Sequence, residues 1–460
     1  MTPSTTLDIR TKDGVRFGKE LREKEFMFQN GFVNLNHGSF GTYPKTVRDK
    51  LRYFQDEAEA SPDDFIRYKY PKLVDEAREA LAKLLNAPPQ TVVLLANATT
   101  GINTVLRNLV FEPGEYIVYF ATIYGACEKT VAYITETTPA KSVKIAYTYP
   151  VEDDWLVDEF KAKVKEIERS RGKVKIAIFD TVVSMPGVRM PFERLTAACR
   201  ELGVLSCIDG AHGVGHVKLD LGALDPDFFV SNCHKWLHVP RGCAVFYVPT
   251  RNQDLIRSTL PTSHGFEPRA SAIGSPLPSA ALTDANKTPW VANFEFVGTM
   301  DNAPYLCVPA ALAWRNTLGG EDVIMNYCHT LARQGAELVA RELRTQVLEN
   351  KTGTLGAACC LSTVRLPISM AKAKQHARNA RLDEASIGTG VRDWLSKALV
   401  DDYGTFIPSL FYGEAWWARL SAQVYLDMAD MEWAAKTLQK ACARIDAGEW
   451  TGAAEQASKL

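Results

Sequence analysis

The chain has 460 residues, of which 46% are hydrophobic, so it can bury a core larger than a single domain usually holds. Charged residues make up 23% of the chain and the formal net charge at pH 7 is −1. This balance excludes the electrostatic footprint of a nucleic-acid-binding or polybasic membrane-binding protein, and we expect two domains with neither kind of partner.

The predicted elements alternate between helices and short apolar strands up to about residue 250. Apolar residues at helical spacing predict helices over 46–60 and 71–86. This alternation predicts an α/β fold whose mainly parallel sheet is covered by helices on both faces and binds ligands at the carboxyl ends of its strands. The further predicted strands are 91–97, 115–122, 173–183, 204–210, 227–232 and 243–249, and the further predicted helices are 102–110, 125–136 and 191–203.

The pattern changes near residue 305. Beyond this point the sequence is largely helical, with an edge strand predicted at 360–368 and a strand followed by a helix near the end. We therefore predict a large domain over 46–304 and a small α+β domain over 305–460, with an N-terminal segment, 1–45, that packs against the small domain.

Cysteine usage and the chain ends bear on the compartment. The ten cysteines form no CxxC pair, which predicts reduced, buried thiols and neither a metal site nor a disulfide scaffold. We find no apolar signal segment and no run of about 18 apolar residues, so we expect no secretion and no membrane span. A cytoplasmic protein is predicted; the C-terminal Ser-Lys-Leu, a peroxisomal address, leaves import into peroxisomes as the alternative.

Three motifs follow predicted strands. SNCHKW at 231–236 shelters Lys235, as an amine that forms a Schiff base requires, although a lysine after a strand is more often solvated. IDGAHGVG at 208–215 places Asp209 at a strand end, where it could hold the pyridinium nitrogen of pyridoxal 5′-phosphate (PLP) or only cap a helix. NATTG at 97–101 forms an anion site at a helix N-terminus, or an ordinary helix cap.

Together these motifs resemble the class V aminotransferases, which are fold-type I PLP enzymes. The similarity is greatest to a fungal branch with hercynylcysteine sulfoxide lyases of ergothioneine biosynthesis, and it extends to the loline-pathway PLP enzyme and to isopenicillin N epimerase-like proteins. The segments that carry this similarity include NLNHGSFGTYPK (34–45), TIYGACEKT (122–130), LPTSHGF (260–266), NFEFVGTMDN (293–302) and WARLSAQVYL (417–426).

The resemblance implies the roles of the site residues. Lys235 would carry PLP as a Schiff base and move the proton at the substrate Cα, Asp209 would pair with the pyridinium nitrogen, and Tyr124 would stack on the ring and protonate the leaving group. Substrate contacts would come from Arg419, as a bidentate carboxylate partner, and from Asn36, His37 and Ser39. The other cofactor contacts would be Thr99, Thr100, His212, Ser231, His234 and, reaching the phosphate of a neighbouring subunit, Thr299.

These roles imply a homodimer with shared active sites that acts on a small amino-acid substrate. The expected reaction is β-elimination from a cysteine S-conjugate or sulfoxide, which gives pyruvate and ammonia. The segment FYGEAW at 411–416 departs from the more basic stretch of the lyases, so that Glu414 could face a different substrate group. A secondary-metabolism enzyme, such as a Mannich-type cyclase, epimerase or aminotransferase, is therefore the alternative.

Overall fold

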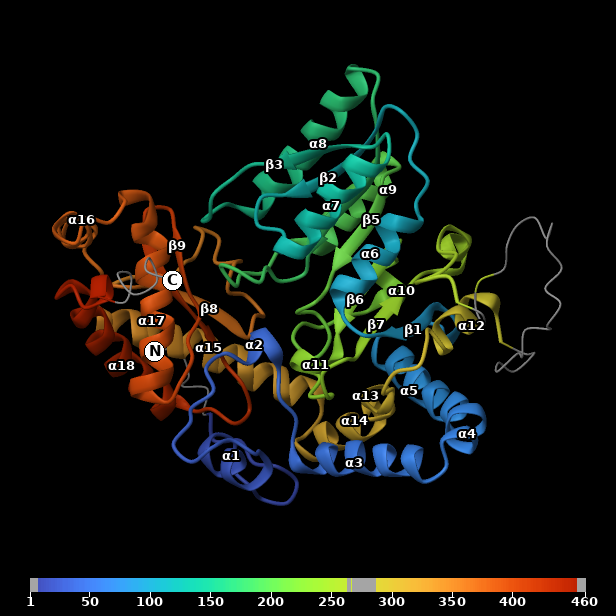
Figure 1. Ribbon diagram of the computed structural model, residues 1–460, viewed down its shortest axis with the longest axis horizontal. Coiled ribbons are helices and arrows are strands. Elements are labelled where there is room, and N and C mark those ends of the chain that lie inside the picture. The colour runs from blue at the N-terminus through green and yellow to red at the C-terminus, as the bar shows by residue number, and fades with distance from the viewer. Residues whose placement is uncertain (1–6, 263–265, 267–286, 453–460) are drawn as a thin grey trace.

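A seven-stranded sheet forms the centre of the computed structural model, which describes residues 7–262, 266 and 287–452 (Figure 1). The strand order is β1-β7-β6-β5-β4-β2-β3; strands β2 to β6 are parallel, and β7 runs antiparallel to both of its neighbours. The strands are Val92–Leu95 (β1), Glu115–Phe120 (β2), Lys141–Ile145 (β3), Lys173–Asp180 (β4), Leu205–Asp209 (β5), Phe228–Asn232 (β6) and Ala244–Tyr247 (β7).

Helices cover both faces of this sheet, which explains why its central strands β5 and β6 are buried at nearly every position. Adjacent strand residues point to opposite faces, so Ile178 packs in the cluster that includes α6 and α7, whereas Phe179 packs in the cluster that includes α8 and α9. The helices around the sheet are Lys45–Ala60 (α3), Pro62–Asp64 (α4), Phe65–Lys69 (η1), Tyr70–Leu84 (α5), Pro89–Thr91 (η2), Ala98–Asn108 (α6), Gly125–Thr137 (α7), Asp153–Arg169 (α8), Phe192–Leu202 (α9), Leu221–Leu224 (α10), Cys233–Trp236 (α11), Thr250–Leu255 (η3), Pro289–Glu295 (α12), Ala303–Leu306 (α13) and Val308–Thr317 (α14).

A second, three-stranded antiparallel sheet follows in the chain, with the order β8-β10-β9. Its strands are Leu361–Arg365 (β8), Ser409–Tyr412 (β9) and Ala415–Ser421 (β10). Helices pack on this sheet and on one another: Glu321–Leu343 (α15), Met370–Asn379 (α16), Glu384–Ser386 (η4), Ile387–Tyr403 (α17) and Met428–Asp446 (α18).

The N-terminal segment, with helices Lys19–Glu25 (α1) and His37–Phe40 (α2), lies against this smaller sheet region. Arg22 forms an ion pair of 2.8 Å with Asp430, and the ring of Phe17 meets that of Tyr327 edge-on. Helices α13 and α14 instead pack against α3 and α5, on the side of the large sheet. A domain boundary at residue 305 would therefore separate α14 from α3 and α5, the helices on which α14 packs. The division into two domains remains a prediction.

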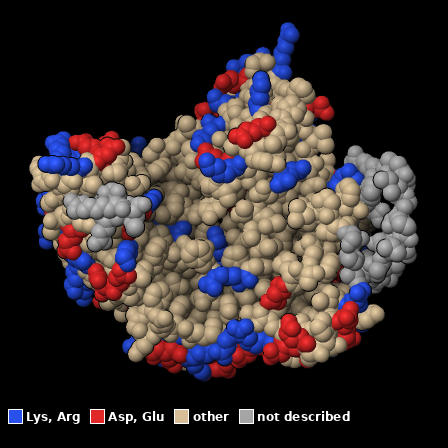
Figure 2. All heavy atoms as spheres, viewed as in Figure 1, with Lys and Arg blue, Asp and Glu red and all other residues tan. Residues whose placement is uncertain are grey.

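A hollow lies between the two lobes, and Figure 2 shows Lys and Arg atoms at its floor within largely uncharged walls. Among the residues that the structure describes, no helix is long and apolar enough to cross a bilayer, and no three His, Cys, Asp or Glu side chains are grouped to hold a metal ion. The Ser-Lys-Leu terminus falls at 458–460, outside the described residues.

Candidate active site

Two carboxylates meet at the carboxyl ends of neighbouring strands, because Asp180 of β4 is in register with Asp209 of β5. Both side chains are buried. Asp209 accepts hydrogen bonds from the backbone N–H of Ala211 at 2.9 Å and from the thiol of Cys127 at 3.2 Å. Oδ2 of Asp180 has no partner among the described residues. Burial, followed by the charge of Asp209, raises the pKa of Asp180 well above its usual value.

Lys235 follows β6 in the short helix α11, and its Nζ lies 3.1 Å from Nε2 of His212. Burial lowers the pKa of Lys235 to about 8, and the charges of Asp209 and Asp180 oppose this effect while that of Arg419 adds to it. The uncharged form of this amine is therefore a minority near neutral pH, about a tenth at pH 7, but far more abundant than for an exposed lysine.

The rings beside the lysine are tightly ordered. Trp236 donates its indole N–H to Nδ1 of His212 at 3.0 Å. Burial, followed by the charge of Lys235, lowers the pKa of His212 well below its usual value, so this imidazole is neutral. Nε2 of His37 lies 2.6 Å from the backbone oxygen of Lys235, and its Nδ1 lies 3.0 Å from the hydroxyl of Tyr425.

These contacts correct one prediction, that His37 contacts the substrate. Its side chain is fully buried and both of its ring nitrogens have partners within the chain. Burial lowers its pKa to about 3, which keeps the ring neutral. His37 therefore supports the backbone of Lys235 and has no nitrogen left for a ligand.

The residues predicted to hold a phosphate come together from α6 and from the β6–α11 junction. Thr99 and Thr100 lie in the first turn of α6, whose Ala98 N–H donates to Oδ1 of Asn232 at 2.8 Å, which ties the helix start to the end of β6. Ser231 accepts a hydrogen bond from Val214 N–H at 2.8 Å, and Nδ1 of His234 lies 3.1 Å from the carbonyl oxygen of Cys243. Thr99 and Thr100 thus lie at the N-terminus of an eleven-residue helix, where anions bind favourably, and Asn232 ties that helix start to the β6–α11 junction from which Ser231 and His234 come.

Arg419 reaches the site from β10 of the smaller sheet and is 1% exposed. Its guanidinium donates to the carbonyl oxygen of Ser184 at 2.5 Å, to Oδ1 of Asn36 at 2.8 Å and to Oγ of Ser39 at 3.0 Å. Its Nε has no partner among the described residues, and no carboxylate pairs with the group. Burial lowers the pKa of Arg419 to about 10, which leaves the side chain charged at neutral pH. The predicted trio of Asn36, Ser39 and Arg419 therefore does assemble.

Three residues singled out from the sequence lie at the surface of the chain. Tyr124 precedes α7, three positions before the Cys127 that contacts Asp209, and 49% of its surface is exposed. Thr299 is exposed in the segment after α12. Glu414 occupies the turn between β9 and β10 with φ 58 and is also exposed. Tyr124 thus remains near the carboxylate pair, whereas Thr299 makes no described contact with the strand ends.

Sequence reasoning missed Asp180, Cys127 and Trp236 as parts of this site. Asp180 had a signal within the predicted strand 173–183, because an acid follows the apolar run IAIF just as Asp209 follows LSCI. Cys127 and Trp236 had no such signal, since a thiol in a helix and an indole beside a lysine are usually only packing residues.

The fold and this set of side chains define a fold-type I PLP-dependent enzyme. The sequence from 43 to 337 matches the model of the class V aminotransferase family, and the chain belongs to that family, which confirms the predicted fold class and cofactor. The chain is 40% identical to the L-cysteine desulfhydrase-like protein lolT1 of Epichloe uncinata, over 94% of this chain and 97% of that protein. It is 29% identical to the hercynylcysteine sulfoxide lyase of Schizosaccharomyces pombe, over 93% and 98% of the two chains. A solved complex of the cystine C–S lyase C-DES with cysteine persulfide shares the fold with a TM-score of 0.68 at 18% identity, over 89% of this chain and 98% of that one.

The side chains of the site fit PLP. The amine of Lys235 has the lowered pKa that bonding to an aldehyde requires, and the buried carboxyl group of Asp209 is of the kind that pairs with a protonated pyridine nitrogen. The anion-binding start of α6 lies beside the same strand ends and matches a phosphate.

Proposed function

We propose that this enzyme is a C–S lyase that catalyses β-elimination on a cysteine S-conjugate or sulfoxide. The observation that carries the proposal is the pairing, in one site, of a partly deprotonated lysine with a buried arginine that lacks a carboxylate partner. An α-amino acid presents the complementary groups, an amine for the cofactor and a carboxylate for the guanidinium. Relatives named as C–S lyases and cysteine desulfhydrases support this class of reaction.

PLP bound at Lys235 supplies an electron sink for negative charge at the substrate Cα. Asp209 would keep the pyridine nitrogen protonated, and the phosphate would be held by Thr99, Thr100, Ser231 and His234. Once released by the substrate amine, Lys235 would take the proton from Cα, and its pKa of about 8 suits a base that works near neutral pH. His212 would keep this amine oriented.

Arg419 would bind the substrate carboxylate in a bidentate pair, and Asn36 and Ser39 would keep the guanidinium in place. The Cβ–S bond then breaks with its electron pair on sulfur, and Tyr124 would donate a proton to the leaving group. The remaining aminoacrylate takes up water and yields pyruvate and ammonia.

The role of Tyr124 is tested by Tyr124→Phe, which keeps the ring and removes the proton. General acid catalysis contributes about 10²–10⁴-fold, so kcat should fall by that factor while the absorbance spectrum of the bound cofactor stays unchanged. Near-wild-type turnover would leave Tyr124 only the stacking role.

Cysteine burial favours elimination over sulfur transfer to the enzyme. All ten cysteines lie in the described part of the chain, and each is buried and unpaired. A thiol that receives sulfur from a substrate must be accessible and largely ionised, whereas burial raises the pKa of Cys127 and Cys359 above the usual value for a thiol. We therefore propose that the sulfur fragment leaves the enzyme as a free product.

We further propose that the substrate is a hercynylcysteine sulfoxide-like compound of ergothioneine biosynthesis, and that the enzyme acts in the cytoplasm or in peroxisomes. A secondary-metabolism reaction such as cyclisation is the second candidate, because identity to the lolT1 protein exceeds that to the lyase, 40% against 29%. We also propose a homodimer in which Thr299 reaches the cofactor phosphate of the other copy. A monomeric, fully active enzyme in light scattering would contradict the dimer.

The experiment that tests the reaction is product analysis on a substrate panel. Purified holoenzyme is mixed with cysteine, cystine, cysteine S-conjugates, their sulfoxides and sulfur-free amino acids, and pyruvate and ammonia are measured by mass spectrometry and coupled assays. We expect both products in equal amounts from at least one sulfur substrate and none with Lys235→Ala. Turnover of a sulfur-free amino acid alone would refute the lyase and favour the biosynthetic candidate.

A further inference from the structure

Trp236 determines which ring nitrogen of His212 carries the proton that faces Lys235. An indole N–H can only donate, so Nδ1 of His212 must accept the bond of 3.0 Å from Trp236. The neutral imidazole then carries its single proton on Nε2, the nitrogen that lies 3.1 Å from Nζ of Lys235. A donor that faces the lysine can be accommodated only if Nζ accepts, which requires the uncharged amine.

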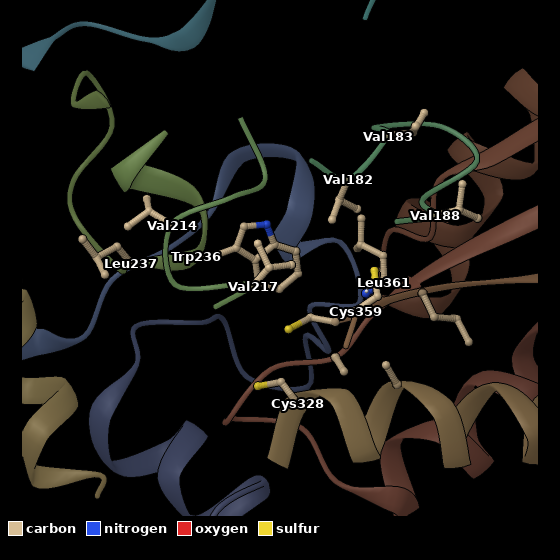
Figure 3. Close-up of a cluster of buried hydrophobic side chains, with 14 of the residues drawn as sticks. Val182, Val183, Val188, Val214, Val217, Trp236, Leu237, Cys328, Cys359 and Leu361 are labelled. Atoms are coloured by element: carbon tan, nitrogen blue, oxygen red, sulfur yellow. Dashed lines mark hydrogen bonds between the residues drawn. The ribbon is translucent and has the colours of Figure 1, made fainter. Parts of the chain in front are cut away.

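The indole that sets this arrangement is itself held firmly. Trp236 is 1% exposed and lies in the apolar cluster of Figure 3 with Val214 and Val217 from the large-sheet region and Cys359 and Leu361 from the smaller-sheet region. Gly38 packs across both rings: a Cβ at this position would lie 3.3 Å from Trp236 and 3.4 Å from His212. Because the rest of the indole packs against apolar side chains, its N–H bonds to His212.

The backbone of the lysine is anchored in the same way from the opposite side. Nε2 of His37 donates to the carbonyl oxygen of Lys235 at 2.6 Å, and the hydroxyl of Tyr425 donates to Nδ1 of His37 at 3.0 Å. Asn34 in turn donates to the oxygen of Tyr425 at 2.8 Å. Both the main chain and the amine of Lys235 are thus in contact with histidines of defined proton position.

We propose that Trp236 is a positioning residue that holds His212 in its Nε2–H form and thereby favours the uncharged amine of Lys235, the form that bonds to the cofactor aldehyde. An amine attacks an aldehyde through the lone pair of its uncharged form; a C=N bond forms and one water leaves, so protonated lysine is inactive in this step. The proposal deepens the role proposed above for Lys235 and rests on it.

Other charges near the pair set the baseline for any titration. The groups that act on Lys235 or His212 are Asp180 of β4, Asp209 of β5, Arg419 of β10, His37 of α2, and His216. Two of these groups also contact the indole, because the rings of His37 and His216 have centroids 5.1 Å and 4.3 Å from that of Trp236, so the test variant has to keep an aromatic ring at this position.

Trp236→Phe tests the proposal because it retains an aromatic ring and removes the donor. His212 can then adopt its Nδ1–H form and accept a hydrogen bond from a lysine ammonium, which stabilises the charged form and raises the pKa of Lys235. The rate at which the full-length apoprotein captures PLP is measured by stopped-flow absorbance from about pH 6.5 to 10. The wild type should have a midpoint near 8, and the variant should have a midpoint at least about one unit higher and be about tenfold slower at pH 7.5.

His212→Leu provides the matched control, since leucine has neither a donor nor an acceptor to turn toward Lys235. In the His212→Leu background, Trp236→Phe should leave the midpoint where it is. An unchanged midpoint in Trp236→Phe alone, or an equal shift in both backgrounds, would overturn the proposal.

A measurement on the unaltered protein covers the case in which a variant does not fold. In ¹⁵N-histidine NMR of the apoprotein, the His212 signals, assigned by their loss in His212→Leu, should show an unprotonated Nδ1 and a protonated Nε2. The reverse pattern would overturn the proposal. Because these readouts follow cofactor capture and proton position, normal results from an enzyme without lyase activity would refute the proposed reaction only.

Discussion

Two arginines in this protein are almost completely inaccessible to solvent, yet their surroundings differ in one respect. Arg315 is 0% exposed and Arg419 is 1% exposed. Arg315 donates through Nε and Nη2 to the two carboxylate oxygens of Glu321, each at 2.5 Å, and through Nη1 to Trp236 O at 2.8 Å and His238 Nδ1 at 2.9 Å. Within the described part of the chain, Arg419 has only neutral oxygens as partners, and its Nε has none.

This difference indicates that Arg315 has a structural role, whereas Arg419 can bind an anionic ligand. Removing two charges from water is costly, and a nearby countercharge with good geometry offsets that cost. Arg315 has such a countercharge and ties α14 to the loop after Lys235, whereas Arg419 keeps an uncompensated charge that burial disfavours, as its pKa of about 10 indicates. We infer that a substrate carboxylate supplies the missing countercharge.

Arg315→Met should give the largest effect, on stability. It breaks a buried ion pair and leaves the carbonyl of Trp236 without its donor, and breaking such a pair costs about 3–5 kcal/mol. Because the side chain of Glu321 is 23% exposed and can recover water, we expect about 3 kcal/mol, at the lower end of that range. Urea unfolding with an unchanged m-value measures it, and Arg315→Met/Glu321→Met should recover part of the loss.

Arg419→Met should give the next largest effect, but on the substrate. Loss of one charge-assisted pair is worth about 1.5–3 kcal/mol, so KM for the amino-acid substrate should rise about 10–100-fold. The free energy of unfolding should fall by less than in Arg315→Met, since the carbonyl of Ser184 loses a donor but no carboxylate loses a partner. Arg419→Lys should recover only part of the binding because the fork geometry is lost. If Arg419→Met were as destabilising as Arg315→Met and left KM unchanged, the distinction between the two arginines would be wrong.

The residues around Lys235 and Asp209 were easier to predict from the sequence than those around Arg419. Lys235 and Asp209 directly follow apolar strands, and the ends of parallel strands meet at one edge, so local pattern was enough to group them. The strand β3 was missed because its residues are charged and largely exposed, which hides the apolar run expected of a strand. The helix α8 was also missed, although Leu156, Phe160 and Val164 have helical spacing.

The part of the site around Arg419, which would bind the substrate carboxylate, depends on contacts between distant parts of the chain. Arg419 meets Asn36 across 383 positions and Ser184 across 235 positions, and no periodicity reports such a pairing. Only the family resemblance singled out Arg419, and it also suggested a ligand contact for His37 that the buried ring does not support. In isolation, Arg315 and Arg419 look alike in the sequence, because the partners that distinguish them are set by tertiary packing.

The smallest expected effect is on thermal stability in the presence of a simple carboxylate. Propionate carries the countercharge that Arg419 lacks and has no amine to react with the cofactor. A ligand at ten times its dissociation constant stabilises the folded state by about 1.4 kcal/mol, which corresponds to a rise in Tm of about 2 °C for a chain of this size. The holoenzyme should show this rise with sodium propionate relative to sodium chloride of equal ionic strength, and Arg419→Met should not. An equal rise in both proteins would mean that propionate binds elsewhere, for example at the start of α6, and that the charge of Arg419 is not available to a carboxylate.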